Sequence, residues 1–401
     1  MPPALTGNGL AMRVGVFAEA AASLGKCLVI ALDSRQTRIQ QKKFSDAHVF
    51  VMDCNRRLDT RLRLIRQVAD NELRINMFKE YGRPVEAMSL SDPVIKDVQA
   101  QLSAFAPDLI MVSRAYLIPV ILALPDQFKA TPVLLDLDDD DASLKRSFSL
   151  HERALGRIDN ARWFDAEAQI YDTLIETARR HVRMFTCASN AVRNGLSCRL
   201  DTEQIKSISN VAPDVLAARR SSRSGSNLLF VGTLGYLPNR DAIEWLAREI
   251  WPRLEKFCPR VKITIAGSEP PADIRSICKE AGFELVADPP ELRHLYRQAS
   301  AAIVPLRLGS GSRIKILEAG AFGVPVISTY AGADGLELDP DTHAYLCDST
   351  ADGFAQSCAQ CLGNENQRTS RAEALQHFVQ TRHNRTRIVG ELGRIITEVA
   401  N

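Results

Sequence analysis

A glycine-rich turn at residues 309–312 is the part of the sequence whose residue types best suit chemistry on a phosphate. It lies between an apolar run that ends at Leu306 and a helical pattern. Glycines let backbone N–H groups approach an anion, and the start of a helix adds a favourable dipole. We predict that the turn binds phosphate and that its last residue caps the helix. Its residues are Gly309, Ser310, Gly311 and Ser312.

Two cations and a carboxylate follow this turn in the same helical pattern. Arg313 and Lys315 are predicted to be catalytic, because they would neutralise the charge of a departing phosphate. Glu318 lies about a turn and a half into the helix, where a carboxylate can accept both hydroxyls of a ribose. The alternative for Glu318 is an ordinary surface position. The segment is not a P-loop, since it lacks the G-K-[ST] ending.

A second glycine turn precedes a helical pattern near the N-terminus. Apolar residues recur there at spacings of four, three, four and three, which gives one apolar face, at Leu10, Val14, Phe17, Ala21 and Leu24. We predict that Gly7 and Gly9 approach a phosphate or a sugar, and that Arg13 on the helix could reach a diphosphate. A plain turn is the alternative.

Five aspartates stand within residues 136–141, where a predicted strand ends. They would repel one another unless something binds them. Carboxylates suit Mg²⁺, so a metal site is one interpretation, although we predict none. A solvated acidic loop or a helix cap is the other.

Short apolar runs alternate with helical patterns, as expected for parallel strands covered by helices on both faces. The runs are 27–32, 48–53, 109–113, 132–138, 184–189, 227–233, 261–267, 284–288, 301–306 and 325–330. We therefore predict an α/β protein with two doubly wound domains that face each other across a cleft. The predicted parts are an N-terminal domain at 1–212, a linker at 213–226, a C-terminal domain at 227–380 and a C-terminal helix at 381–401.

Composition and charge argue against a nucleic-acid-binding protein and against a membrane-spanning protein. A net charge of +2 over 401 residues gives no field for nucleic acid, and no apolar run approaches the ~20 residues that span a bilayer. Without a hydrophobic signal core at the start, we expect a cytoplasmic protein. Cys358 and Cys361 are interpreted as packed helix residues rather than half of a redox or metal site.

An arginine-rich helical stretch at 56–83 could rest on anionic lipid at the inner face of the membrane. A solvated helix face is the alternative.

Residues 228–336 resemble the donor-binding domain of the family 4 (group 1) glycosyltransferases, which have the GT-B fold of two Rossmann-like domains. The resemblance lies in FVGTLGYLPNRDAIEWLAREIWPRL, ITIAGSEPP and ELVADPPELRHLYRQASAAIVPLRLGSGSRIKILEAGAFGVPVIS. The N-terminal half is similar more loosely, through GNGLAMRVGVFAEAAASLG and PVLLDLDDD.

The resemblance implies a UDP- or GDP-sugar donor, retention of configuration, and no essential metal or other cofactor. It places the donor ribose at Glu318, the diphosphate at 309–313, the nucleobase at 285–292, and further donor contacts at Gly232 and Thr233. Asp138 stands where the family often has histidine, so Asp138, or its neighbour Asp139, would orient an acceptor hydroxyl or stabilise a charged transition state.

Three departures from the family pattern stand out. Ser310 replaces the first of two glutamates spaced eight positions apart. Thr233, Pro238 and Asn239 fall where the family has arginine and lysine, so Arg313 and Lys315 would have to compensate, with Arg240 as a weaker candidate. The first strand of the N-terminal domain is expected to be short or missing, from a truncated or misassigned start.

The sequence is therefore interpreted as a glycosyltransferase of polysaccharide or glycoconjugate synthesis, with a glycan or lipid-linked acceptor. One alternative is a nucleotide-sugar 2-epimerase on the same fold, which would need no acceptor. The other is a non-catalytic member that only binds a nucleotide sugar.

Overall fold

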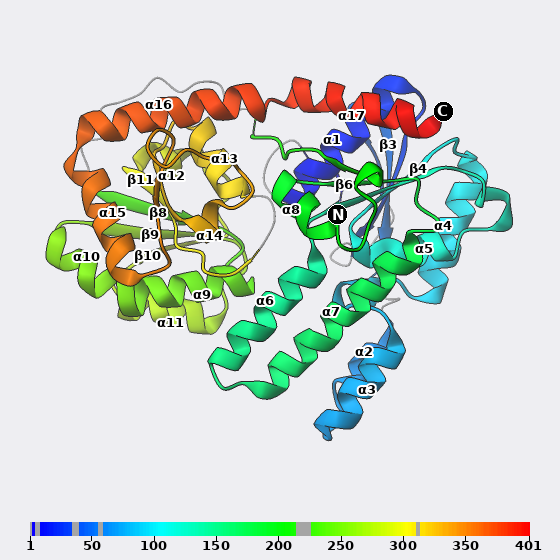
Figure 1. The fold of residues 1–401 in the computed structure, drawn as a ribbon, viewed down its shortest axis with the longest axis horizontal. Helices are drawn as coiled ribbons and strands as arrows, with labels where there is room; N and C mark the ends of the chain where they lie inside the picture. Colours follow the sequence, from blue (N-terminus) through cyan, green and yellow to red (C-terminus); the bar gives the residue numbers. More distant parts are fainter. Residues whose placement is uncertain (1, 5–8, 34–39, 55–58, 214–225, 310–312) are drawn as a thin grey trace. The chain divides into compact units, whose positions relative to one another are not determined.

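The computed structural model describes residues 2–4, 9–33, 40–54, 59–213, 226–309 and 313–401. These residues form two compact units (Figure 1). The N-terminal unit comprises the described residues of 1–211 together with 385–401, and the C-terminal unit comprises those of 212–309 and 313–384. Most of the expected linker, at 214–225, lies outside the described residues.

The C-terminal unit is built on a six-stranded parallel sheet with the order β10-β9-β8-β11-β12-β13. Its strands are β8 Asn227–Val231, β9 Lys262–Gly267, β10 Glu284–Ala287, β11 Ala301–Val304, β12 Val326–Thr329 and β13 Tyr345–Cys347. This strand order is that of a doubly wound dinucleotide-binding sheet. Successive strands are added on one side of β8 up to β10 and on its other side from β11 onward, so the strand order reverses between β8 and β11. Five of the predicted strands are confirmed, whereas β13 was not predicted.

Helices cover this sheet on both faces, as its continuously buried strands require. They are α9 Leu237–Trp245, α10 Trp251–Phe257, α11 Ala272–Glu280, α12 Arg293–Gln298, α13 Ile314–Ala321, α14 Tyr330–Ala333, α15 Ala351–Gly363 and α16 Glu365–Arg382. Cys358 and Cys361 are buried and unbridged on α15, which agrees with their interpretation as packed helix residues.

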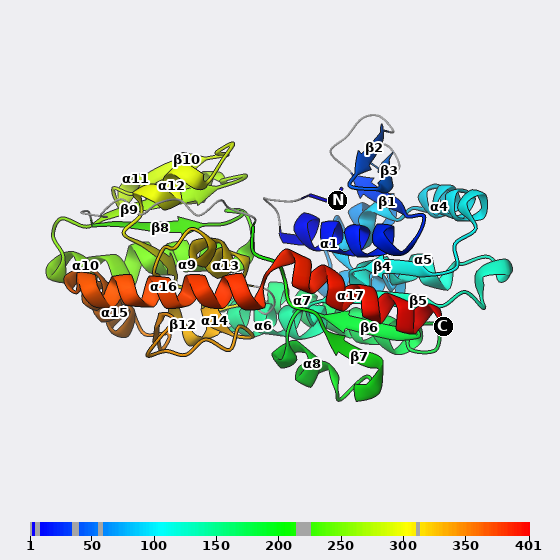
Figure 2. The same ribbon diagram turned by 90° about the horizontal axis from the view of Figure 1, so that it is seen from above.

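The N-terminal unit contains two groups of strands (Figure 2). A four-stranded parallel sheet, β4-β5-β6-β7, consists of β4 Ile110–Ser113, β5 Val133–Asp138, β6 Met184–Cys187 and β7 Ile205–Ser207. In the other group, β3 Ala47–Asp53 pairs in parallel with β1 Leu28–Asp33 and antiparallel with β2 Gln40–Phe44. The sequence did not predict β2 and β7. Among the described residues, no strand precedes α1.

The helices of the N-terminal unit include a long hairpin made of α6 and α7. The helices are α1 Gly9–Leu24, α2 Thr60–Ile65, α3 Asn71–Tyr81, α4 Asp92–Phe105, α5 Ile118–Leu122, α6 Asp141–Ala154, α7 Ile158–Ala178, α8 Asn190–Leu196 and α17 Arg385–Ala400. The hairpin projects from this unit beside α2 and α3 (Figure 1), and Phe78 of α3 stacks on Trp163 of α7 at 4.0 Å between ring centres.

The arginine-rich stretch forms two short helices in its described part rather than one long one. Asp59 caps α2 and Asp70 caps α3, each by accepting a hydrogen bond from a backbone N–H of its helix. An aspartate that caps a helix begins a new one, so the two caps divide the stretch.

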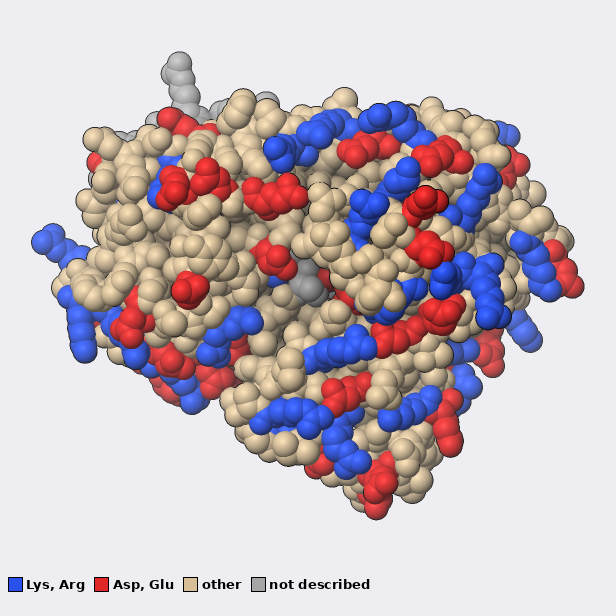
Figure 3. Space-filling view, viewed as in Figure 1, with Lys and Arg blue, Asp and Glu red and all other residues tan. Residues whose placement is uncertain are grey.

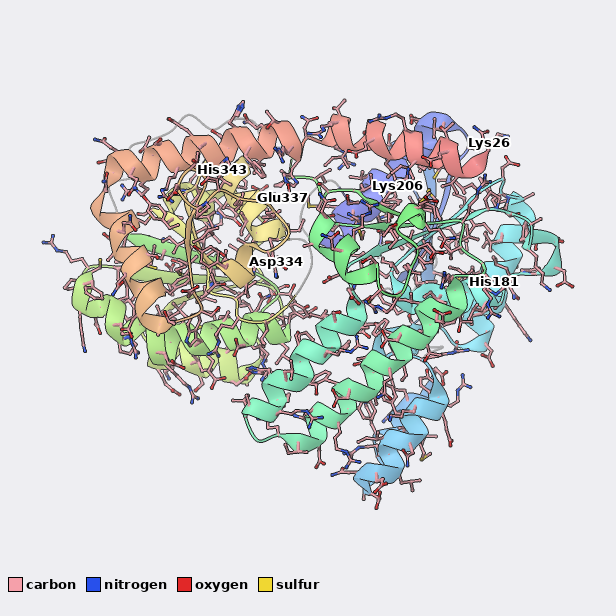
Figure 4. The ribbon with its side chains drawn as sticks, in the orientation of Figure 1. Lys26, His181, Lys206, Asp334, Glu337 and His343 are labelled. Carbon is pink, nitrogen blue, oxygen red and sulfur yellow. The ribbon has the colours of Figure 1, made fainter. Side chains whose placement is uncertain are left out.

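The C-terminal helix α17 packs on α1 of the N-terminal unit. Met12 and Val16 of α1 join Leu392 and Ile396 of α17 in one buried cluster with Leu134 of β5. At the edges, Arg385 pairs with Glu19 at 2.7 Å, and Lys206 of β7 pairs with Glu398 at 3.2 Å (Lys206 is labelled in Figure 4). The last helix therefore belongs to the core of the first unit.

No helix in the described part of the chain is long and apolar enough to cross a membrane.

Candidate functional site

The predicted phosphate turn follows β11, the neighbour of β8 at the point where the strand order reverses. In doubly wound sheets, ligands bind outside the carboxyl ends of the strands at this point. Thr233 follows β8 and is exposed, while Gly309 follows β11 and begins the approach to α13. The structure therefore brings three predicted donor contacts, Gly232, Thr233 and Gly309, to one end of the sheet. Ser310, Gly311 and Ser312 lie outside the described residues.

Two glycines allow the ends of β8 and β9 and the start of α9 to approach one another closely. A Cβ on Gly267 would lie 1.7 Å from the carbonyl oxygen of Gly232, and a Cβ on Gly232 would lie 2.7 Å from Nδ2 of Asn239. Asn239, on the first turn of α9, can then donate from Nδ2 to the carbonyl oxygen of Thr233 at 2.8 Å. The glycines thus let α9 approach the end of β8.

Gly309 itself has a φ of +100°, a left-handed conformation that favours glycine.

Lys315 lies at the same end of the sheet. Its Nζ donates to Oδ1 of Asn239 at 2.7 Å and lies 4.5 Å from the ring centre of Phe230, a residue of β8. Burial, reinforced by the charge of Arg313, lowers the pKa of Lys315 to about 7. Its ammonium group therefore titrates near neutral pH, and a bound anion would favour the charged form.

Arg313 is buried and links two segments of the backbone. Its Nη2 donates to the carbonyl oxygens of Gly309 at 2.8 Å and Ala331 at 2.6 Å, which connects Gly309 to α14. Arg313 is only 5% exposed, whereas Lys315 is partly buried. The catalytic roles of both residues stay predictions.

Glu318 is buried, so the alternative of an ordinary surface glutamate is wrong. Its side chain is only 7% exposed, and its Oε2 accepts a hydrogen bond from the hydroxyl of Tyr296 at 3.1 Å. Burial raises the pKa of Glu318 to about 7, against the opposing effects of the Tyr296 hydrogen bond and the charge of Lys315. A carboxylate has about four lone pairs, and Tyr296 occupies one of them, so others can accept a ligand's hydroxyls.

Arg307 is a third cation at this end of the sheet, and it was not predicted from the sequence. Its Nη2 pairs with Oδ1 of Asp241 at 2.6 Å, and its guanidinium lies 4.8 Å from the centre of a Trp245 ring. Its position three residues after the end of the buried strand β11 was a signal that could have identified it.

Arg13 is held inside the N-terminal unit. Its Nη2 and Nε donate to the two carboxylate oxygens of Asp136 at 2.7 and 2.8 Å, and Nη1 donates to the carbonyl of Ile208 and to Asn210. The residue is 2% exposed. This geometry gives Arg13 a structural role, and contact with a diphosphate stays a prediction. Gly9 is the first residue of α1, and Gly7 lies outside the described residues.

Asp138 lies at the end of β5 with a φ of 61°, and Arg114 follows β4 with a φ of 88°. Left-handed conformations cost a non-glycine residue of order 1 kcal/mol or more, and they gather at functional sites. The two residues are neighbours, because Arg114 Nη1 donates to Oδ2 of Asp138 at 3.1 Å. Oδ1 of Asp138 accepts from Asn210 at 3.2 Å.

The five aspartates are buried, so a solvated acidic loop is wrong. A helix cap is correct for Asp140, which caps α6. Three arginines of the same unit partner four of the aspartates, in the pairs Arg13–Asp136, Arg114–Asp138, Arg114–Asp141 and Arg199–Asp140. Within the described ranges, no group of three or more His, Cys, Asp or Glu side chains could hold a metal ion.

One family model matches residues of the C-terminal unit. Residues 225–364 match the family model described as "Glycosyl transferases group 1". A Klebsiella pneumoniae protein described as an uncharacterized 44.6 kDa protein in the cps region is 32% identical over 117 residues. That match covers 27% of this chain, and the chain spans 30% of the length of that relative. The resemblance to group 1 glycosyltransferases is thus confirmed where the family model matches.

Two solved structures resemble almost the whole chain in fold. Sucrose-phosphate synthase from Thermosynechococcus elongatus has a TM-score of 0.70 at 14% identity, over 98% of this chain and 94% of its own. HepE from Anabaena, solved in complex with UDP and glucose, has a TM-score of 0.64 at 13% identity, over 99% of this chain and 98% of its own. The predicted α/β fold of the GT-B type is confirmed.

Proposed function

We propose that this chain, whose C-terminal unit carries a glycosyl transferases group 1 domain, moves a sugar from a nucleoside diphosphate sugar to a hydroxyl of a glycan or lipid-linked acceptor. The observation that carries the proposal is the buried carboxylate of Glu318, three residues after Lys315, at the reversal point of a doubly wound sheet. A carboxylate that accepts ribose hydroxyls and cations that face a diphosphate are the groups that such a donor requires.

In the proposed reaction, the acceptor hydroxyl attacks the anomeric carbon and the nucleoside diphosphate leaves. The largest demand is stabilisation of the negative charge that develops on the leaving phosphate. Lys315 and Arg313, with backbone N–H groups of the turn 309–311, would meet this demand. Asp138 would orient the acceptor hydroxyl, and with retention of configuration the donor phosphate would accept its proton.

UDP-sugars are the first donors to test, because HepE was solved with UDP and glucose and shares this fold. GDP-sugars remain the second choice. The cps-region relative supports a role in polysaccharide synthesis, although it covers only part of the chain.

The acceptor could be presented at a membrane surface on the inner face of the cell. The helices that project from the N-terminal unit expose large apolar side chains, at Leu64, Leu73, Leu150, Leu155 and Ile158. Residues 59–83 carry six basic and four acidic side chains, and Figure 3 shows charges of both signs over this part of the molecule. Exposed apolar side chains next to basic side chains suit peripheral contact with a membrane that contains anionic lipid.

The proposal is tested by a thermal-shift panel of UDP-, GDP-, ADP-, CMP- and dTDP-sugars. A ligand that binds the folded state raises the unfolding temperature by mass action. We expect Glu318→Ala to remove most of the shift, and Glu255→Ala, at an exposed position of α10, to keep it. An unchanged shift in Glu318→Ala would refute the ribose assignment.

Product analysis then separates the alternatives. Release of the nucleoside diphosphate with a glycosylated acceptor supports transfer. An epimerised donor without acceptor would identify a 2-epimerase, and binding without turnover a non-catalytic protein. The last outcome would agree with Ser310, Thr233 and Asn239 at positions where the family has charged residues.

A further inference from the structure

One buried carboxylate oxygen of the N-terminal unit has no protein partner. Asp141, the first residue of α6, is 3% exposed. Its Oδ1 accepts from Nη2 of Arg114, whereas its Oδ2 has no hydrogen-bond partner in the part of the chain that the structure describes. Nearly all buried polar atoms in proteins are hydrogen-bonded, because an unsatisfied one loses its hydration without compensation. The position of this oxygen therefore needs an explanation.

The oxygen lies at the carboxyl end of the parallel sheet, where such sheets bind ligands. Arg114 follows β4 and bridges Asp138 and Asp141 with its two terminal nitrogens. The carboxylates of the end of β5 and the start of α6 are thereby fixed side by side. Both Arg114 and Asp138 hold left-handed conformations there.

The charges around this end of the sheet are unbalanced. Five buried aspartates at residues 136–141 stand beside three arginines, Arg13, Arg114 and Arg199, and Arg114 is shared by two of the aspartates. Lys145, whose charge also acts on Asp141, is itself held by Glu86 at 2.8 Å and Glu167 at 3.0 Å. The excess of carboxylates favours a ligand group that donates hydrogen bonds and disfavours a phosphate or a carboxylate.

We propose that Asp141 is an acceptor-binding residue whose Oδ2 accepts a hydrogen bond from a hydroxyl of the acceptor. This inference rests on the proposed function and adds to it a site for the acceptor. It also gives the acceptor a chemical class, since the part of the acceptor seated at Asp141 carries hydroxyl groups rather than an anionic group. Asp138, one residue before Asp139 on the same strand end, would hold the same or a neighbouring hydroxyl.

The protonation of Asp141 supports the assignment. Burial raises the pKa of Asp141 to about 7, and the charge of Arg114 opposes this rise. The charged and titratable groups that face it are Arg114, Asp138, Asp139, Glu86, Lys145, Tyr116 and Tyr171. Because only the ionised carboxylate accepts at both oxygens, acceptor affinity should rise as pH increases through about 7.

The test compares Asp141→Asn with Asp140→Asn, a matched control one residue away. The control removes the same charge, and asparagine is also a good helix cap. The probes are octyl glucoside, octyl galactoside and free N-acetylglucosamine, with the donor found in the thermal-shift panel. Binding is followed by saturation-transfer NMR, and transfer by initial rates. Circular dichroism and thermal unfolding check the fold.

We expect Asp141→Asn to raise KM for the acceptor roughly tenfold or more, which corresponds to loss of one charged hydrogen bond. The donor-induced thermal shift should stay unchanged in both variants, and Asp140→Asn should keep the wild-type KM. If Asp141→Asn fails to fold, Asp141→Glu, which keeps the charge but displaces the oxygen, takes its place with the same expected rise.

An acceptor KM within twofold of wild type in the folded variant would overturn the inference. Failure of every glycoside to bind the wild-type protein, with donor binding intact, would overturn it as well. Failure of every nucleotide sugar to bind would instead refute the proposed function, so the two failures are distinguishable.

Discussion

Glu318, the proposed ribose-binding residue, is a buried carboxylate that lowers the stability of the protein when it is ionised. It accepts a hydrogen bond from Tyr296, which itself stacks on Phe322 with ring centres 4.8 Å apart. The charged form is destabilised by burial, which is why its pKa rises. Ribose hydroxyls would supply the missing donors, so the strain of the ligand-free site would be relieved on binding.

We predict that Glu318→Gln stabilises the ligand-free protein at neutral and alkaline pH. A rise in pKa from 4.5 to about 7 corresponds to roughly 3 kcal/mol at most, at about 1.4 kcal/mol per unit. Because the folded pKa is raised, this penalty is absent below the unfolded pKa and is complete once pH exceeds the folded pKa. Thermal unfolding should therefore show an advantage for the variant that grows from about pH 5 to about pH 8.

The matched control for this prediction is Glu255→Gln, whose carboxylate is exposed. It should show no pH-dependent difference from wild type. If Glu318→Gln and the wild type unfold at the same temperature at every pH in this range, the ionised carboxylate is not destabilised by burial.

We also predict a bell-shaped pH dependence of donor affinity. Glu318 must be ionised to accept hydroxyls, and Lys315 must be protonated to attract the diphosphate. Both groups have a pKa of about 7 in the free protein, so affinity should fall on either side of neutrality. Calorimetric titration with a UDP-sugar measures this dependence, since its diphosphate diester does not titrate in that range.

The Lys315→Arg variant separates the acid and alkaline falls in donor affinity, because arginine stays protonated over the whole pH range of the titration. The alkaline fall in affinity should disappear in this variant, while the acid fall remains. Persistence of the alkaline fall would assign it to a different group.

At the scale of elements, the packing of β8 against β9 shapes the proposed donor site. The two strands end so close together that no side chain fits at Gly267, where a Cβ would lie 1.7 Å from the Gly232 carbonyl oxygen. The same closeness seats Asn239 between Thr233 and Lys315. A separation of the strand ends would move all of these groups.

We predict that Gly267→Ala destabilises the C-terminal unit by about 1–3 kcal/mol or more, because backbone must shift to admit the methyl group. Thermal unfolding would show a lower midpoint, and the donor-induced shift would shrink. Gly235→Ala is the control, since its Cβ would lie 3.5 Å from the carbonyl oxygen of Glu269, an ordinary contact. Equal midpoints for the two variants would contradict the prediction.

At the scale of the whole molecule, the exposed apolar side chains of α2, α3 and the α6–α7 hairpin are available for contact with a surface outside the protein. Leu64 is 61% exposed and Leu150 is 69% exposed, although both are large and aliphatic. A membrane surface would cover them and would bring a lipid-linked acceptor to the N-terminal unit.

We predict that the protein binds vesicles containing anionic lipid and does not bind neutral vesicles. Binding should weaken between about 0.05 and 0.5 M salt, because screening shortens the range of charge attraction. Vesicle co-flotation measures it. The double variant Leu64→Ser, Leu150→Ser should reduce binding, whereas Leu122→Ser, at an exposed leucine of α5, should not. Equal binding of neutral vesicles would contradict the charge contribution.

The sequence by itself determined the strands other than β2, β7 and β13, because buried parallel strands are continuous apolar runs that are visible locally. It also placed the glycine turn, Lys315 and Glu318 relative to one another, since these residues lie within ten positions on one strand-turn-helix segment. Spacing within a single element fixes such geometry without knowledge of the fold.

Only the tertiary structure decided the partners of these groups. Tyr296 meets Glu318 from another helix, Asn239 meets Lys315 across 76 residues, and Arg13 meets Asp136 across 123 residues. The return of α17 to the first unit, and the burial of the aspartates among arginines, likewise depend on contacts between distant segments. Such contacts leave no local pattern, because a buried charge is satisfied by whichever side chain the fold brings to it.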